Sequence, residues 1–100
     1  MDVIFRTRKL ERCYERIEYG RRRWGQEGAE ALVMRVDMLK AAADMQEVRG
    51  LPVIRCHPLK GDKKGKWAIT VIGRIRLVFS LYGASMERIR IEEVSRHYGD

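Results

Sequence analysis

The spacing of apolar residues changes halfway along the chain, near Gly50 and Pro52, and this change constrains the fold more than any other feature. Before it, apolar residues recur three and four positions apart, as one face of a helix requires. After it, short runs rich in β-branched and aromatic residues follow one another, as strands do. The helical runs are Leu10 to Ile17 and Ala29 to Ala43, and the strand runs are WAITVIG, RIRLVFSLYG and MERIRIEEV.

Helices in the first half and strands in the second half predict an α+β fold. Val3, Ile4 and Phe5 are enough for one short strand before the helices. We therefore expect the order β-α-α-β-β-β, with two N-terminal helices packed on one face of a mostly antiparallel sheet of about four strands.

Local signals give the expected boundaries. Thr7 is a suitable N-cap for the first helix, and glycines at 20, 25 and 28 mark a break within RRRWGQEG before the second. The Gly73-Arg74 pair predicts a tight hairpin. In MERIRIEEV, alternation in steps of two puts Ile89, Ile91 and Glu93 on one side, with the isoleucines toward the core, and Arg88, Arg90 and Glu92 toward solvent.

One hundred residues suit one domain, which we place over residues 1–100. No apolar run approaches the roughly 20 residues that would span a bilayer. The N-terminus MDVIFRTRK has no signal-peptide pattern. We therefore expect a cytoplasmic protein with no membrane partner.

The two cysteines, Cys13 and Cys56, stand in no zinc-ligand spacing and form no disulfide framework. Both are interpreted as buried thiols. We expect neither a metal nor a cofactor.

Positive charge is concentrated in one segment. The chain has 21 Lys and Arg against 14 Asp and Glu, a net charge of +7. Between Arg55 and Arg76, seven basic residues stand against one acid, Asp62. Such a balance favours a polyanionic partner that meets this segment.

The same segment reads RCHPLKGDKKGKWAITVIGRIRLVF, and with it the chain resembles the RelE/ParE toxin superfamily, closest to its HigB-like branch. The core of the likeness is His-x-Leu-Lys-Gly-Asp with the downstream Arg76. It is reinforced by FRTRKLERCYE, by LP before the strands, and by IEEV near the end.

This resemblance implies the toxin of a bacterial type II toxin-antitoxin pair. Its implied partners are a cognate antitoxin, expected to be of helix-turn-helix type, and operator DNA only through the antitoxin complex. Relatives of the RelE and HigB type cut mRNA in the ribosomal A site, while ParE-type relatives inhibit DNA gyrase without cutting. We favour a ribosome-dependent mRNA endonuclease, because the chain retains the His and the Lys cluster.

Cleavage of RNA through its own 2′-hydroxyl needs no metal, but it needs proton transfer and stabilisation of charge on the phosphate. His57 matches the family position implicated in catalysis, and a strand fixes Arg76 for the developing charge. Phosphates of mRNA and rRNA are expected to meet the other cations of the segment, Arg55, Lys60, Lys63, Lys64, Lys66 and Arg74.

The tail SRHYGD departs from the family, which usually has Asp-Tyr-His there. Aligned through IEEV and Gly99, the chain has Arg96 at the usual acidic position, and a shift by one residue puts Ser95 there instead. The acidic residue is lost in both cases, although His97 and Tyr98 remain as candidate catalytic residues. Two other functions stay open. One is a ParE-like gyrase inhibitor, and the other is a catalytically degenerate relative that only binds the antitoxin.

Overall fold

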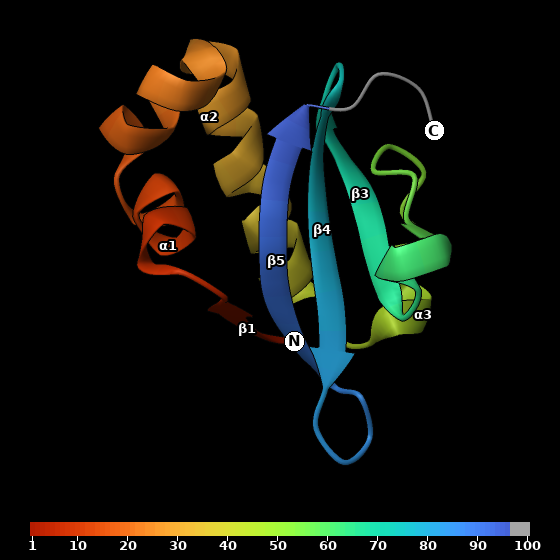
Figure 1. Cartoon of the computed structure of the whole chain (residues 1–100). Coiled ribbons are helices and arrows are strands. Elements are labelled where there is room, and N and C mark those ends of the chain that lie inside the picture. Colours follow the sequence, from red (N-terminus) through yellow and green to blue (C-terminus); the bar gives the residue numbers. More distant parts are fainter. Residues whose placement is uncertain (97–100) are drawn as a thin grey trace.

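The computed structural model describes residues 1–96. The tail residues His97 and Tyr98 therefore lie outside the described residues. Within the described range, five strands form one sheet and the helices gather on one side of it (Figure 1).

The N-terminal segment follows its local signals. Strand β1 (Asp2–Phe5) precedes helix α1 (Arg8–Glu15). The Leu10 amide donates to Thr7 Oγ1 at 3.2 Å, which confirms the predicted N-cap.

Helix α2 (Ile17–Ala41) contains the predicted glycine break. Gly25 has φ 75° and ψ 175°, so two helical pieces meet there at a kink. The sequence predicts one unbroken helical run from Leu10 to Ile17, and this was wrong: Arg16 adopts extended angles and separates α1 from α2. This break turns the chain so that α1 can pack against α2, where the Tyr14 hydroxyl donates to Asp37.

The short helix α3 (Met45–Arg49) is a third helix, where the sequence predicted two. The Glu47 amide donates to Asp44 Oδ1 at 2.9 Å, and Gly50 is the C-cap. The chain then leaves the helical half.

The sheet order is β1-β5-β4-β3-β2. Its other strands are β2 (His57–Pro58), β3 (Lys66–Ile72), β4 (Ile75–Tyr82) and β5 (Arg88–Arg96), and a 3₁₀ turn, η1 (Gly61–Lys63), lies between β2 and β3. All pairs are antiparallel except β1 with β5, which is parallel. The prediction of a mostly antiparallel sheet is confirmed, with five strands rather than about four.

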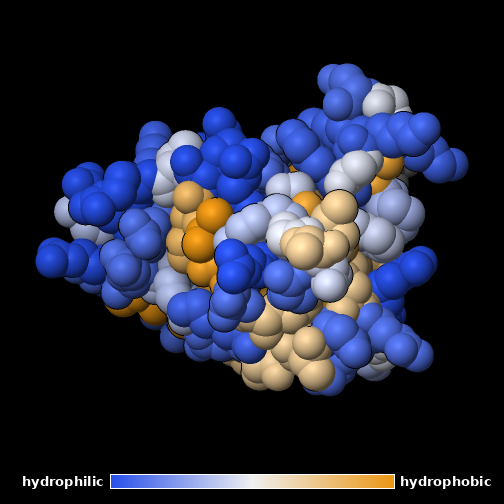
Figure 2. All heavy atoms as spheres, turned by 90° about the horizontal axis from the view of Figure 1, so that it is seen from below, coloured by the Kyte–Doolittle hydropathy of each residue, from blue (hydrophilic) through white to orange (hydrophobic). Residues whose placement is uncertain are grey.

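Helices α1 and α2 and the sheet enclose the core. Val36 and Leu39 on α2 and Ile69, Leu77 and Phe79 on β3 and β4 are fully buried there. Within residues 1–96, no helix is both long and apolar enough to cross a membrane. Viewed from the end that carries the N-terminus, the surface is largely hydrophilic, with apolar residues gathered near its centre (Figure 2).

The alternation predicted for the last strand is wrong after Ile91. Ile91 pairs with Phe79 and Glu93 with Val78, so Glu92 is an extra residue at a β-bulge. Glu92 was expected in solvent but is only 3% exposed. Glu93 was expected on the side of Ile91 but lies opposite Val78, on the other face of the sheet.

Candidate functional site

The sheet register brings residues distant in sequence onto the face turned away from the helical core. His57 pairs with Ala68, Ala68 with Val78, and Val78 with Glu93. Because directly paired residues point to the same side, these four side chains form one row across β2, β3, β4 and β5. Ala68 and Val78 in the middle of this row are buried, while His57 and Glu93 at its ends are partly exposed. We call this face of the sheet the site face.

Arg76 belongs to the next row of the site face. It pairs with Thr70 on β3 and with Ser95 on β5. Its side chain is half-buried and its Nε atom is buried. A central strand of the sheet therefore holds the guanidinium, with His57 on one side of it and Glu93 on the other.

His57 is held by a local contact. Its Nδ1 lies 2.9 Å from the carbonyl oxygen of Arg55. A protonated Nδ1 can donate to this carbonyl, which leaves Nε2 for a substrate. The exposed Arg55 itself has φ 49°, a left-handed conformation that costs energy for a residue other than glycine.

The predicted lysines surround the site face at different depths. Lys60 and Lys64, at the ends of η1, are exposed. Lys66 is half-buried and pairs with Ser80, so it lies in a row of the site face. Exposed lysines such as Lys60 and Lys64 are suited to sequence-independent phosphate contacts.

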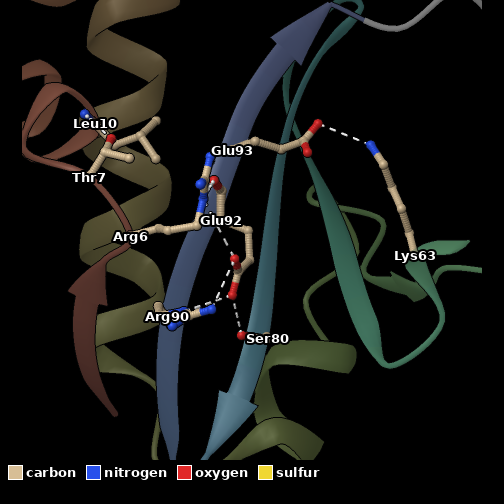
Figure 3. Close-up of polar contacts among 8 residues, drawn as sticks. All are labelled: Arg6, Thr7, Leu10, Lys63, Ser80, Arg90, Glu92 and Glu93. Carbon is tan, nitrogen blue, oxygen red and sulfur yellow. Dashed lines mark hydrogen bonds and ion pairs between the residues drawn. The ribbon is translucent and has the colours of Figure 1, made fainter.

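Lys63 reaches across the site face. It belongs to η1, yet its Nζ lies 3.1 Å from Glu93 Oε1 on β5 (Figure 3). Both side chains are partly exposed, at 41% for Lys63 and 35% for Glu93. The ion pair therefore connects η1 to β5 across the site face.

Arg74 lies apart from the other cations. It occupies the predicted hairpin with Gly73, whose φ is 55°, and it is exposed. It lines a shallow pocket together with Trp24 and Arg96. This places Arg74 beside the end of β5 rather than next to η1.

The bulge adds an acidic cluster that strand alternation did not predict. Glu92 Oε2 accepts from Ser80 Oγ at 2.6 Å and from Arg90 Nε at 2.8 Å (Figure 3). Arg6 Nε donates to the Glu92 carbonyl oxygen at 2.9 Å. The sequence signal of this bulge was the pair Glu92-Glu93, because two adjacent carboxylates interrupt the alternation of apolar and charged residues.

Two opposing effects act on the pKa of Glu92. Burial by itself raises it, but the hydrogen bonds from Arg90 and Ser80, helped by the charges of Arg90 and Lys66, lower it below the ordinary value of 4.5. Glu92 is therefore a buried carboxylate held by its partners, and Glu93 is the more accessible one.

No metal-binding cluster is found within residues 1–96: three or more His, Cys, Asp or Glu side chains nowhere gather in that range. Cys13 and Cys56 are free thiols, Cys13 buried and Cys56 half-buried. Burial raises the pKa of Cys56 to about 11, which keeps it in the weakly nucleophilic thiol form.

Solved structures with the same fold cover nearly the whole chain. A YoeB/ParE toxin from Agrobacterium tumefaciens is 20% identical with a TM-score of 0.66, over 98% of this chain and 100% of that chain. YafQ from E. coli strain BL21(DE3) is 16% identical with a TM-score of 0.58, over 96% and 92%. A YoeB-YefM complex from Staphylococcus aureus gives 13% and 0.64, over 98% of each chain.

These likenesses show the fold of the RelE/ParE toxins. Residues 3–92 also match the model of the HigB-like toxins, the RelE-like toxins of the type II toxin-antitoxin system HigB. The chain therefore belongs to the HigB-like family, as its sequence indicated. A search of curated proteins finds no significant match.

Proposed function

We propose that this toxin is a ribosome-dependent, metal-independent mRNA endonuclease that inhibits translation. The observation that carries the proposal is the common face of His57 and Arg76, with Lys63 and Lys66 beside them. A proton-transfer group, a fixed guanidinium and phosphate-binding cations are the parts that cleavage through a 2′-hydroxyl requires.

Each part has a role in this reaction. The RNA phosphates are held by the lysines and by Arg55 and Arg74, through contacts that do not depend on base sequence. Arg76 binds the phosphate under attack, where negative charge develops. His57 exchanges a proton with the RNA through Nε2, since Nδ1 is occupied by the Arg55 carbonyl. His97 and Tyr98 assist proton transfer from the tail.

The test is expression in a translating extract, followed by mapping of mRNA 5′ ends. The toxin should produce cuts within the reading frame, and His57→Ala or Arg76→Ala should abolish them. Arg12→Ala is the matched control, because Arg12 is an exposed cation on α1, outside the site face. Intact mRNA with the wild-type toxin would refute the proposal. Accumulated complexes of gyrase with cleaved DNA would then identify a ParE-like inhibitor, and normal growth an inactive relative.

The proposed partners are mRNA in the ribosomal A site, rRNA and a cognate antitoxin of helix-turn-helix type. Operator DNA would be contacted only through the antitoxin complex. The solved complex of YoeB with YefM supports a protein partner for this fold. Co-expression of a small protein encoded beside this gene should restore growth and co-purify with the toxin. Failure of both would remove that protein as the antitoxin.

A further inference from the structure

The β5 bulge places two consecutive carboxylates on the site face. In a regular strand, neighbours point to opposite faces, and one of these two would enter the core. Here Glu92 reaches Ser80 and Arg90, while Glu93 lies opposite Val78. Bulges next to active sites commonly redirect a side chain in this way.

The two carboxylates are in different situations. Glu92 is 3% exposed, and its side-chain oxygens already accept hydrogen bonds from Ser80 and Arg90. Glu93 is partly exposed, and within residues 1–96 its polar contacts are Lys63 at 3.1 Å and a long hydrogen bond from Ser95 at 3.4 Å. Glu93 is therefore the carboxylate that a substrate on this face can reach.

The Lys63–Glu93 contact is easily opened. Both partners are partly exposed, and an ion pair between exposed side chains contributes little to stability because water screens it. A phosphodiester offers Lys63 an alternative anion at the same place. Binding of RNA by Lys63 would then release Glu93 beside the bound phosphate.

We propose that Glu93 is the general base of the cleavage reaction, and that Lys63 pairs with Glu93 until an RNA phosphate binds Lys63 in its place. This inference rests on the proposed endonuclease function. It supplies a carboxylate from β5 in a chain whose tail lacks the acidic residue that sequence comparison led us to expect.

The positions suit the two ends of one reaction. His57 on β2 and Glu93 on β5 are three strands apart in one row, about 14 Å between backbones at about 4.8 Å per strand. Arg76 lies between them on β4, in the adjacent row. A phosphodiester bound at Arg76 would have a proton acceptor on one side and a proton donor on the other.

Glu93 takes the proton of the 2′-hydroxyl as that oxygen bonds to phosphorus. The bond from phosphorus to the 5′ oxygen breaks, and this oxygen takes a proton from protonated His57. The products are a 2′,3′-cyclic phosphate and a 5′-hydroxyl end. Exchange with water then restores both side chains.

The experiment measures cleavage rate on mRNA-loaded ribosomes for wild type, Glu93→Gln and Glu93→Asp, across pH and at saturating ribosomes. General-base catalysis typically contributes 10²–10⁴-fold, so we expect Glu93→Gln to lose about 100-fold or more in rate. It should also lose the acidic limb of the pH-rate profile. Binding should be unchanged or tighter, because Lys63 is freed. Glu93→Asp should keep the acidic limb of the pH-rate profile, with a reduced cleavage rate.

Glu87→Gln is the matched control, because Glu87 is an exposed carboxylate in the segment between β4 and β5, next to Arg88. Its rate should equal that of wild type. Thermal unfolding of each variant identifies any loss through misfolding, and Glu93→Asp provides the second test in that case. If Glu93→Gln cleaves at the wild-type rate, or loses only affinity for ribosomes, this inference is overturned while the proposed function stands. Absence of cleavage by the wild type would overturn the proposed function and this inference together.

Discussion

Ser80 Oγ donates a 2.6 Å hydrogen bond to Glu92 Oε2, and this bond connects β4 to the extra residue of the β5 bulge. The carboxylate is almost fully buried, so each donor that it loses leaves negative charge without compensation. The bond therefore stabilises the bulge that directs Glu93 onto the site face.

Ser80→Ala should lower the free energy of unfolding by about 1.5–3 kcal/mol, the usual contribution of a hydrogen bond to a charged group. Urea denaturation measures this change. Ser85→Ala is the control, because Ser85 is exposed and the contact that it makes is through its backbone amide. It should change stability by less than about 0.5 kcal/mol. Equal stability of Ser80→Ala and Ser85→Ala would contradict this account.

Stability should also depend on pH through Glu92. Its folded pKa is below its ordinary value of 4.5, so ionised Glu92 contributes stability above that value. The contribution should be lost as pH falls through the folded pKa. Urea midpoints measured from neutral pH to well below 4.5 should therefore fall more steeply for wild type than for Glu92→Gln. Parallel curves for the two proteins would show that another group governs acid unfolding.

Gly25→Ala should destabilise the fold through the backbone alone. Gly25 has φ 75° and ψ 175°, a region that glycine alone adopts readily, and a Cβ built there meets nothing within 4 Å. We expect a loss of about 1–3 kcal/mol in the free energy of unfolding, measured by urea denaturation. Gly50→Ala is the control, because Gly50 has ordinary helical angles and an added Cβ makes ordinary contacts at 3.5 Å. A smaller effect at Gly25 than at Gly50 would argue against the kink.

Lys64→Ala should weaken ribosome binding and reduce its salt dependence. A phosphate contact adds about one to the slope of log affinity against log salt, so the slope should decrease by about one. The measurement is binding to ribosomes over a series of salt concentrations. Arg12→Ala on α1, an exposed cation whose pocket is lined by residues of α1 and α2 and by none of the sheet, is the control and should keep the wild-type slope. An unchanged slope for Lys64→Ala would remove this lysine from the proposed RNA contacts.

Much of the fold could be predicted because its signals are local. Thr7 and Asp44 cap helices through contacts within three residues, and Gly73 allows a turn between adjacent strands. The break at Arg16 could not be predicted in this way. Its extended angles allow α1 to pack on α2. This packing depends on contacts between residues distant in sequence, such as Tyr14 with Asp37.

The same distinction between local signals and distant contacts applies to the candidate site. By itself, the sequence determined that a basic segment with His57, Arg76 and several lysines lies among strands, and that the chain is a HigB-like toxin, because charge, residue type and motif are properties of neighbouring residues. Only the tertiary structure decided that Glu92 is buried and that Glu93 faces Lys63. A bulge depends on which residues of β4 pair with β5, and pairing between strands is settled by packing of the whole sheet.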